Sequence, residues 1–230
     1  MADHMQDEAD LEALKRWWDE NGKGLVGAVA VAGLGTLGWQ QYQDYSSSQV
    51  EAASDLYASM LSTQLEGGDP EQLEAVAEIL KEEHAGTAYA RFGAMLQARV
   101  AVEADDLATD DLATAETALR WALSAGNTRD DFGQLIQLRL ARVLAAQDKE
   151  AEALAILAQG SSAYPIAYFQ AVGDIHLAGG QTEEALMAYR AGRDASVELG
   201  QMSAVLDNKV RTLETRVPVA ADGNPTGEAS

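Results

Sequence analysis

The residues whose types most invite a chemical role are Asp174 and His176, which stand two positions apart. A carboxylate and an imidazole can share a metal ion or act together as a general base. On a helix, however, side chains at that spacing point to different faces. His176 also stands at a packing position of the repeat described below, so we predict a structural role for it.

A second candidate is the acidic group Asp105, Asp106, Asp110 and Asp111, since carboxylates are ligands for hard cations. This group lacks the glycine and the bidentate glutamate spacing of a calcium loop, so a solvated loop is the preferred interpretation. The sequence has no nucleophile elbow, phosphate loop or zinc-ligand cluster, and no cysteine for thiol chemistry. We therefore predict no catalytic residue, no metal site and no cofactor, and expect that the chain is not an enzyme.

The charge of the chain bears on its partners. The formal net charge is -21, and residues 48–230 alone contain 13 basic and 29 acidic residues. Nucleic-acid binding depends on a basic surface that neutralises phosphates. We therefore predict no nucleic-acid partner. The length after residue 48 is ample for one hydrophobic core.

The stretch that must position everything after it is the apolar run at residues 24–39, GLVGAVAVAGLGTLGW. Its sixteen residues would cover roughly 24 Å as a helix, less than the approximately 30 Å of a bilayer core. Counting residues 22–45 extends the helix to roughly 36 Å and places Trp39, Tyr42 and Tyr45 at an interface. Its glycines would weaken a helix in water but are common in membrane helices. We predict a single transmembrane helix at residues 23–43.

Two alternatives compete with a membrane anchor. The run could be a buried core helix rich in small residues, although Thr36 is its only hydroxyl and it has no polar stripe. It could also be the core of a cleaved signal peptide. The segment after Trp39 has no close small-x-small cleavage site, and the acidic N-terminal 23 residues make an unusual n-region. An uncleaved signal anchor is the favoured interpretation.

The orientation follows from basic residues, because acidic ones count little in the positive-inside rule. Lys15, Arg16 and Lys23 precede the run, and the next basic residue is Lys81. We predict that the N-terminus stays in the cytoplasm. The expected parts are a cytoplasmic segment at 1–22, the anchor at 23–43, an exported helical domain at 44–216 and a disordered tail at 217–230.

Within the predicted anchor, small residues recur every fourth position, at Gly24, Ala28, Ala32 and Thr36. Such a face permits close packing against another transmembrane helix. Glycine and alanine are also common in membrane helices that have no partner. A helix-partner face is therefore a hypothesis that stands beside plain anchoring.

The rest of the chain to residue 216 predicts helices, with no sustained alternation typical of strands. Gly67 and Gly68 end one helix, and Asp69 is placed to cap the next, with Pro70 at its first position. After residue 200 we expect a last helix that covers the open end of the array. Its apolar residues are Met202, Val205, Leu206, Val210 and Leu213.

The later part of the chain repeats: residues 141–160 and 173–192 align without gaps at a spacing of 32. The matched pairs are Ala141 with Gly173, Leu144 with His176, Ala153 with Ala185, Leu154 with Leu186, and Leu157 with Tyr189. Small residues recur where two helices approach closely, so we expect Ala153 and Ala185 to be buried between paired helices. A degenerate unit covers residues 89–123 and has a longer interhelix segment at 103–111.

This pattern resembles the tetratricopeptide repeat, whose period is about 34 residues. The residues that fall on the pattern positions of that family are Phe169, Val172, Gly173, His176, Ala185 and Tyr189, with His176 replacing the usual tyrosine. The expected fold is therefore all-α: a single N-terminal transmembrane helix followed by a tetratricopeptide-like helical-repeat solenoid. Three helix pairs would make a short solenoid with a concave face for binding.

The N-terminal region, residues 11–44, resembles the start of the YfgM family, the ancillary subunit of the SecYEG translocon. A basic-aromatic-aromatic segment and Glu-Asn-Gly-Lys open a glycine-rich span that closes on Gly-Trp. The motif that opens the span comprises Lys15, Arg16, Trp17, Trp18, Asn21, Gly22 and Lys23, and the match continues with Glu20, Gly38 and Trp39. It extends through the helical domain, including LRLARV at 138–143, and covers nearly the whole chain except the tail.

The resemblance implies a single-pass inner-membrane protein of a Gram-negative bacterium, with its C-terminal domain in the periplasm. It also implies partners: the SecYEG translocon, a PpiD-like periplasmic chaperone and exported polypeptides. The long segment at 103–111, the acidic charge and the C-terminal extension depart from the family. A periplasmic scaffold for another envelope assembly complex, with the same fold, is the alternative function, and a hydrolase or metal-dependent enzyme is a third.

Overall fold

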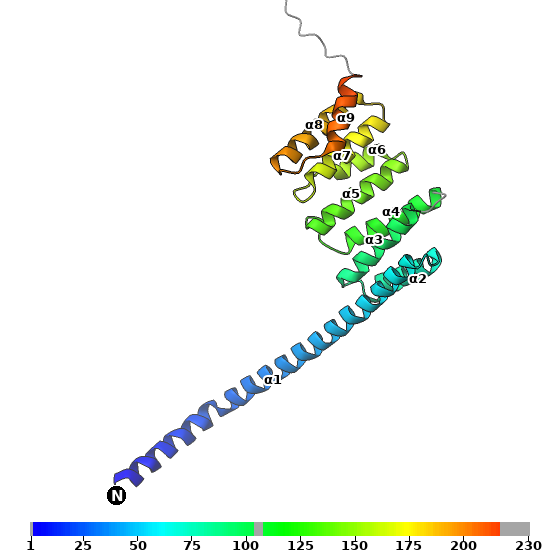
Figure 1. Ribbon diagram of the computed structural model, residues 1–230. Coiled ribbons are helices and arrows are strands. Elements are labelled where there is room, and N and C mark those ends of the chain that lie inside the picture. Colours follow the sequence, from blue (N-terminus) through cyan, green and yellow to red (C-terminus); the bar gives the residue numbers. More distant parts are fainter. Residues whose placement is uncertain (1, 104–107, 217–230) are drawn as a thin grey trace, which may run out of the picture. The chain divides into compact units, whose positions relative to one another are not determined.

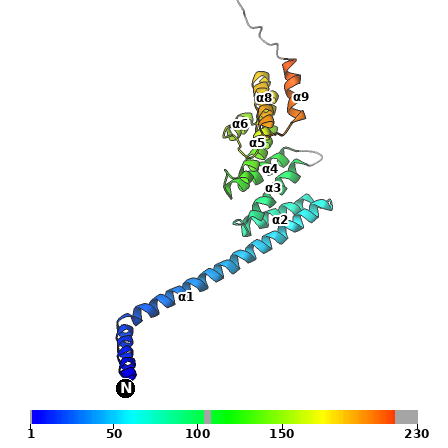
Figure 2. The same cartoon turned by 60° about the vertical axis from the view of Figure 1, so that its left-hand side comes forward.

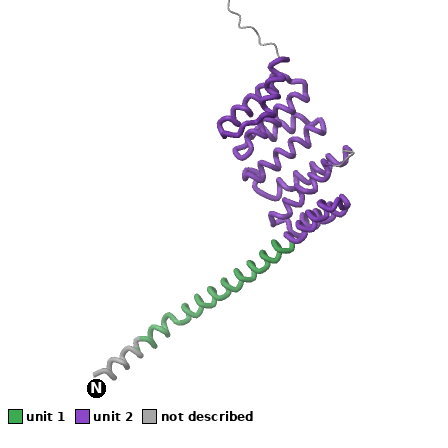
Figure 3. The backbone as a smooth tube through the Cα atoms, in the orientation of Figure 1, with its two compact units in different colours: residues 1–52 green, residues 53–230 purple. Residues whose placement is uncertain are grey.

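The computed structural model describes residues 2–103 and 108–216, and every regular element in these ranges is an α-helix (Figure 1). The helices are α1 (Ala2–Leu65), α2 (Pro70–Glu83), α3 (Ala88–Val102), α4 (Thr109–Ser124), α5 (Asp131–Ala146), α6 (Glu150–Leu157), α7 (Pro165–Ala178), α8 (Thr182–Glu198) and α9 (Ala204–Glu214). The chain divides into two compact units, residues 1–52 and 53–230 (Figure 3). The expectation of an all-helical fold is confirmed for the described residues.

The first unit is formed by most of helix α1. The apolar side chains in the predicted anchor face outward, with exposed fractions of 72% for Val31, 71% for Leu34 and 66% for Leu37. The alternative of a buried core helix is wrong for this segment, because nothing in the described structure covers those side chains. Nowhere in the two described ranges is there a helix that combines the length and the apolar character needed to cross a membrane.

The junction between α1 and α2 follows the expected turn chemistry. Helix α1 ends at Leu65, and Gly67 has a φ of 70°, a left-handed conformation that favours glycine. Asp69 then caps α2 by accepting a hydrogen bond from the Glu71 backbone N–H at 3.0 Å. Pro70 occupies the first helical position, where its missing N–H has no intrahelical partner to lose.

In the second unit the helices from α2 to α9 stack in chain order, each against the next (Figure 1, Figure 2). Three hydrophobic clusters follow this order: one joins the end of α1 to α2 and α3, a central one extends from α3 to α7, and a third joins α8 to α9. Because each helix contacts mainly its neighbours, this is the nearest-neighbour packing of a repeat solenoid.

The alignment at a spacing of 32 matches residues that pack alike. Ala153 on α6 and Ala185 on α8 are both 0% exposed, which confirms their predicted burial between paired helices. The large residues one turn later, Leu157 and Tyr189, are 3% and 0% exposed. Small residues at the first pair of positions therefore let the helices approach, and large ones at the second fill the space beside them.

The position at which α4 starts corrects the prediction that the whole acidic group lies in a solvated loop. That helix begins at Thr109, so Asp110 and Asp111 lie in its first turn instead of in a solvated loop. The Asp111 side chain accepts a hydrogen bond from the Ala108 backbone N–H at 2.8 Å, and negative charge at a helix N-terminus is favourable. Asp105 and Asp106 lie outside the described residues.

The last helix covers the end of the array as expected, but with fewer residues. Leu206, Val210 and Leu213 on α9 are buried. The helix begins only at Ala204, capped by Ser203, so Met202 precedes it and is 90% exposed. Val205 faces outward and is 54% exposed. The predicted disordered tail, residues 217–230, lies outside the described residues.

Candidate functional site

The structure does not bring Asp174 and His176 together. The carboxylate of Asp174 accepts hydrogen bonds from the Tyr189 hydroxyl and the Lys209 ammonium group, each at 2.6 Å. His176 Nδ1 lies 2.6 Å from the Gln181 side-chain oxygen in the turn after α7. Neither residue is left to bind a metal with the other, and no group of three metal-ligating side chains is found in the described ranges.

Asp174 belongs to a contact that holds α9 against the last helix pair. Tyr189 is fully buried, and the Lys209 ammonium group lies 5.0 Å from the centre of its ring. Burial raises the pKa of the Tyr189 phenol, and its hydrogen bond to Asp174 raises the pKa further. The hydroxyl is thus kept protonated as a donor, and the arrangement is structural.

Tyr189 leaves no room beside Gly173. A Cβ atom at that glycine would overlap the Tyr189 ring, so the backbone of α7 and the ring of Tyr189 on α8 are in direct contact. Val172 and His176 are half-buried around this contact. Gly173, Ala185 and Tyr189 from the repeat signature therefore lie in one helix–helix interface.

Phe169, the remaining signature residue, is 38% exposed, and its neighbour Tyr168 is the buried aromatic residue on that turn. The Tyr168 hydroxyl donates a hydrogen bond to the Gln134 backbone carbonyl at 2.7 Å. Burial raises the pKa of Tyr168 to about 12. Tyr168 therefore links α7 to α5, a connection that the repeat pattern did not indicate.

The motif that opens the predicted anchor is helical throughout. Lys15, Arg16 and Lys23 are exposed, and Trp17 and Trp18 are about half exposed, at 49% and 51%. The Asn21 side-chain amide donates to the Trp17 carbonyl oxygen at 3.1 Å. Gly22 is buried beneath the Trp18 ring, where a Cβ atom would lie 3.1 Å from ring carbons. Glycine at this position therefore lets the indole lie flat along the helix.

The predicted helix-partner face is open in the first unit. Gly24, Ala28, Ala32 and Thr36 are all exposed, and a Cβ atom added at Gly24 would meet no atom within 4 Å. The Thr36 hydroxyl donates to the Gly33 carbonyl oxygen at 2.9 Å, so its polar group is satisfied within its own helix. The face could thus contact an apolar neighbour without leaving a buried donor unpaired.

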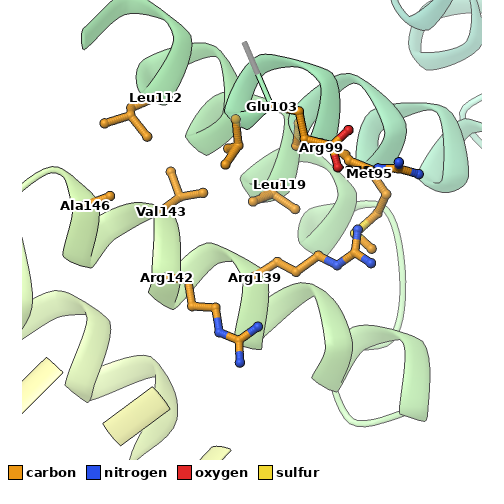
Figure 4. A pocket seen from close by; sticks show the side chains of 11 residues that line it. Met95, Arg99, Glu103, Leu112, Leu119, Arg139, Arg142, Val143 and Ala146 are labelled. Carbon is orange, nitrogen blue, oxygen red and sulfur yellow. Dashed lines mark hydrogen bonds and ion pairs between the residues drawn. The ribbon is translucent and has the colours of Figure 1, made fainter. Parts of the chain in front are cut away.

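A pocket of about 450 Å³ lies in the second unit and was not predicted from the sequence (Figure 4). Helices α3, α4 and α5 each contribute to its wall. Its lining residues are Met95, Ala98, Arg99, Val102, Glu103, Leu112, Leu119, Arg139, Arg142, Val143 and Ala146. The only local signal was LRLARV at 138–143, where two arginines three residues apart interrupt an apolar stretch.

Known proteins resemble this chain over most of its length. The family model described as a tetratricopeptide repeat-like domain matches residues 15–215. An ancillary SecYEG translocon subunit from Aggregatibacter actinomycetemcomitans is 30% identical, over 87% of this chain and 95% of that protein. Proteins of the same name from Haemophilus influenzae and Neisseria gonorrhoeae are 27% and 29% identical, over 89% and 82% of this chain and 97% and 88% of their own. No solved structure matches the chain significantly.

Proposed function

This chain belongs to the tetratricopeptide repeat-like family of ancillary SecYEG translocon subunits, and we propose that it acts at the membrane beside the SecYEG translocon. The observation that carries the proposal is the similarity to a subunit of that name over 95% of its length, together with a family model that matches residues 15–215. The role is that of a non-enzymatic adaptor, since stacked helix pairs act by presenting surfaces for binding.

We propose that residues 23–43 anchor the protein by a single span in the bacterial inner membrane. The outward-facing valine and leucine side chains of this segment support the anchor, because lipid would cover them. The exposed Lys15, Arg16 and Lys23 before it support a cytoplasmic segment at 1–22. On this topology residues 44–216 form a periplasmic domain, followed by the tail at 217–230.

We further propose that the periplasmic domain links exported polypeptides to a PpiD-like chaperone. An array of helix pairs at the exit of a translocon would meet chains as they emerge and before they fold. The open pocket between α3, α4 and α5 supports such contacts, because an apolar cavity of this size can hold side chains of an unfolded segment.

The open helix face gives this proposal a direct test by affinity purification of the intact protein from detergent-solubilised membranes. Gly24→Leu combined with Ala28→Leu keeps the helix apolar but fills the face on which a partner would approach. We expect the recovery of translocon subunits to fall about tenfold, which corresponds to about 1.4 kcal/mol of lost contact.

The matched control is Ala30→Leu combined with Gly33→Leu, which adds the same bulk on the opposite side of the helix. Ala30 and Gly33 are also exposed, so the control should retain wild-type recovery. Equal recovery by both double variants would show that this face does not contact the translocon. Absence of translocon subunits from the wild-type preparation would overturn the proposed function itself.

A further inference from the structure

Three arginines gather around the pocket between α3, α4 and α5, in a chain with only 16 basic residues and a net charge of -21. Arg99 comes from α3, and Arg139 and Arg142 come from α5 (Figure 4). Figure 4 shows Arg139 reaching toward Met95 and Arg99, whereas Arg142 points away from the apolar floor. We call this site the arginine-rimmed pocket.

The floor of the arginine-rimmed pocket is apolar and firmly held. Leu119 is 1% exposed, and Met95 and Val143 are each 6% exposed, so these side chains belong to the central hydrophobic cluster. Ala98 and Leu112 continue the same surface. An apolar side chain of a ligand would therefore be covered by groups that are already fixed in place, with little ordering required on binding.

The charges on the rim are poorly compensated. Arg99 forms an ion pair with Glu103 at 2.9 Å. Arg139 and Arg142 form no ion pair with any acid in the described parts of the chain. Burial of the half-buried Arg139 lowers its pKa, and repulsion from Arg99 and Arg142 lowers it further, while the Glu103 carboxylate offsets this only in part. A bound anion would relieve both the desolvation and the repulsion.

Elsewhere in the second unit most cations are matched with nearby acids, and the exceptions in the described ranges, Arg129, Arg211 and Arg216, are exposed to water. Arg120 and Lys149 share Glu116, and Arg190 pairs with Glu214 at 2.7 Å. Acidic residues outnumber basic ones by more than two to one, so the chain contains many carboxylates that could pair with arginines such as Arg139 and Arg142. Arg139 differs from the other unpaired arginines because it is half-buried, and no acid in the described ranges pairs with it, so the pocket can accept a carboxylate from another molecule.

We propose that the arginine-rimmed pocket binds an acidic amphipathic segment of another polypeptide. An apolar side chain of that segment enters the pocket over Leu119 and Val143, and its carboxylates meet Arg139 and Arg142. Guanidinium groups suit this task because their planar fork bonds two carboxylate oxygens at once. The proposal extends the adaptor function. It rests on that function, because the adaptor role is the reason for taking the ligand to be a polypeptide.

Charge favours a peptide over a larger polyanion. Residues 48–230 contain 29 acidic against 13 basic residues, so a nucleic acid or an anionic membrane surface would be repelled by most of the domain. A short segment with a few carboxylates can reach the rim without approaching the acidic surface around it. Interactions beyond about 8–10 Å are screened at physiological salt, which further favours a compact ligand.

Fluorescence anisotropy of a labelled short peptide, in which leucines alternate with glutamates, tests the proposal on the full-length protein in detergent. Arg139→Glu combined with Arg142→Glu should weaken binding of this peptide by about tenfold or more, because attraction becomes repulsion. Arg129→Glu combined with Arg211→Glu makes the same change in net charge at two exposed arginines outside the pocket and should leave binding unchanged. Melting curves of both variants establish that they fold.

Three further binding measurements, with a lysine peptide, lipid vesicles and a DNA strand, determine the nature of the ligand. A peptide with lysines in place of glutamates should bind weakly to wild type and more tightly to the Arg139→Glu, Arg142→Glu variant. Equal binding of both peptides, or equal binding by both double variants, would overturn the proposal. So would binding of anionic lipid vesicles or of a short DNA strand that depends on Arg139 and Arg142 while the acidic peptide does not bind.

The same variants separate this inference from the proposed function. Arg139→Glu combined with Arg142→Glu should still co-purify with translocon subunits through the helix face at Gly24. If wild type recovers the translocon and the peptide fails to bind, only the arginine-rimmed pocket is refuted. Peptide binding without any translocon recovery would support the pocket and refute the proposed function.

Discussion

Gly173→Ala should lower the free energy of unfolding by about 1–3 kcal/mol, because the added methyl group would overlap the ring of Tyr189. The ring cannot move aside freely. It is fully buried, its hydroxyl is bound to Asp174 at 2.6 Å, and Lys209 lies over its face. A larger residue such as valine should be worse still. Thermal and urea melts of the full-length protein measure the effect.

Gly179→Ala is the matched control for this prediction. It lies in the turn after the same helix, and its Cβ would meet nothing closer than carbonyl oxygens at 3.7 Å. Its φ of -75° is accessible to alanine, so stability should be unchanged or slightly raised. Equal stability of the Gly173→Ala and wild-type proteins would mean that α7 and α8 are not as closely packed as described.

The repeat indicates a second substitution that should restore part of the stability lost in Gly173→Ala. At the matched positions of the preceding pair, alanine and leucine (Ala141 and Leu157) stand where glycine and tyrosine stand in the last pair. Tyr189→Leu should therefore recover part of the stability lost in Gly173→Ala, although it also removes the hydrogen bond to Asp174. A double-mutant cycle should give a favourable coupling between the two changes. Strict additivity would contradict the shared interface.

The proposed topology has the next largest expected effect, since it decides whether a fused reporter enzyme is active or inactive. Alkaline phosphatase fused after Arg216 should be active, because the fusion point lies on the periplasmic side of the proposed anchor. A fusion at Trp18 should be inactive, because it ends before the proposed anchor and the reporter would stay in the cytoplasm. An inactive C-terminal fusion on an intact protein, or cleavage of the anchor, would contradict the topology.

The helical repeat could be predicted because its signal is local and periodic. Ala153 and Ala185 are small at a spacing of 32, and both are buried where a helix pair requires close approach. The turn at Gly67, Asp69 and Pro70 could also be predicted, since each residue has a conformational or capping preference that acts over a few positions. Such features depend little on the rest of the fold.

Features that depend on neighbouring helices could not be predicted in the same way. Met202 and Val205 keep the helical spacing but are exposed, because α9 starts later than the spacing indicated and no neighbour covers them. The arginine-rimmed pocket escaped notice because Arg99 and Arg139 lie forty positions apart in the sequence and meet only when α3 and α5 pack. In the described ranges Arg139 and Arg142 pair with no acid, which is a property of the folded surface.

Site-specific photo-crosslinking in intact cells tests the central claim most directly. A crosslinking amino acid at Thr36 should capture a helix of the SecYEG translocon, because that position lies on the open face of the proposed anchor. One at Ala146, an exposed residue on the edge of the pocket, should capture exported polypeptides or a PpiD-like chaperone. Consistent capture of another envelope assembly at both positions, with no translocon subunit and no chaperone, would contradict the account and favour a periplasmic scaffold.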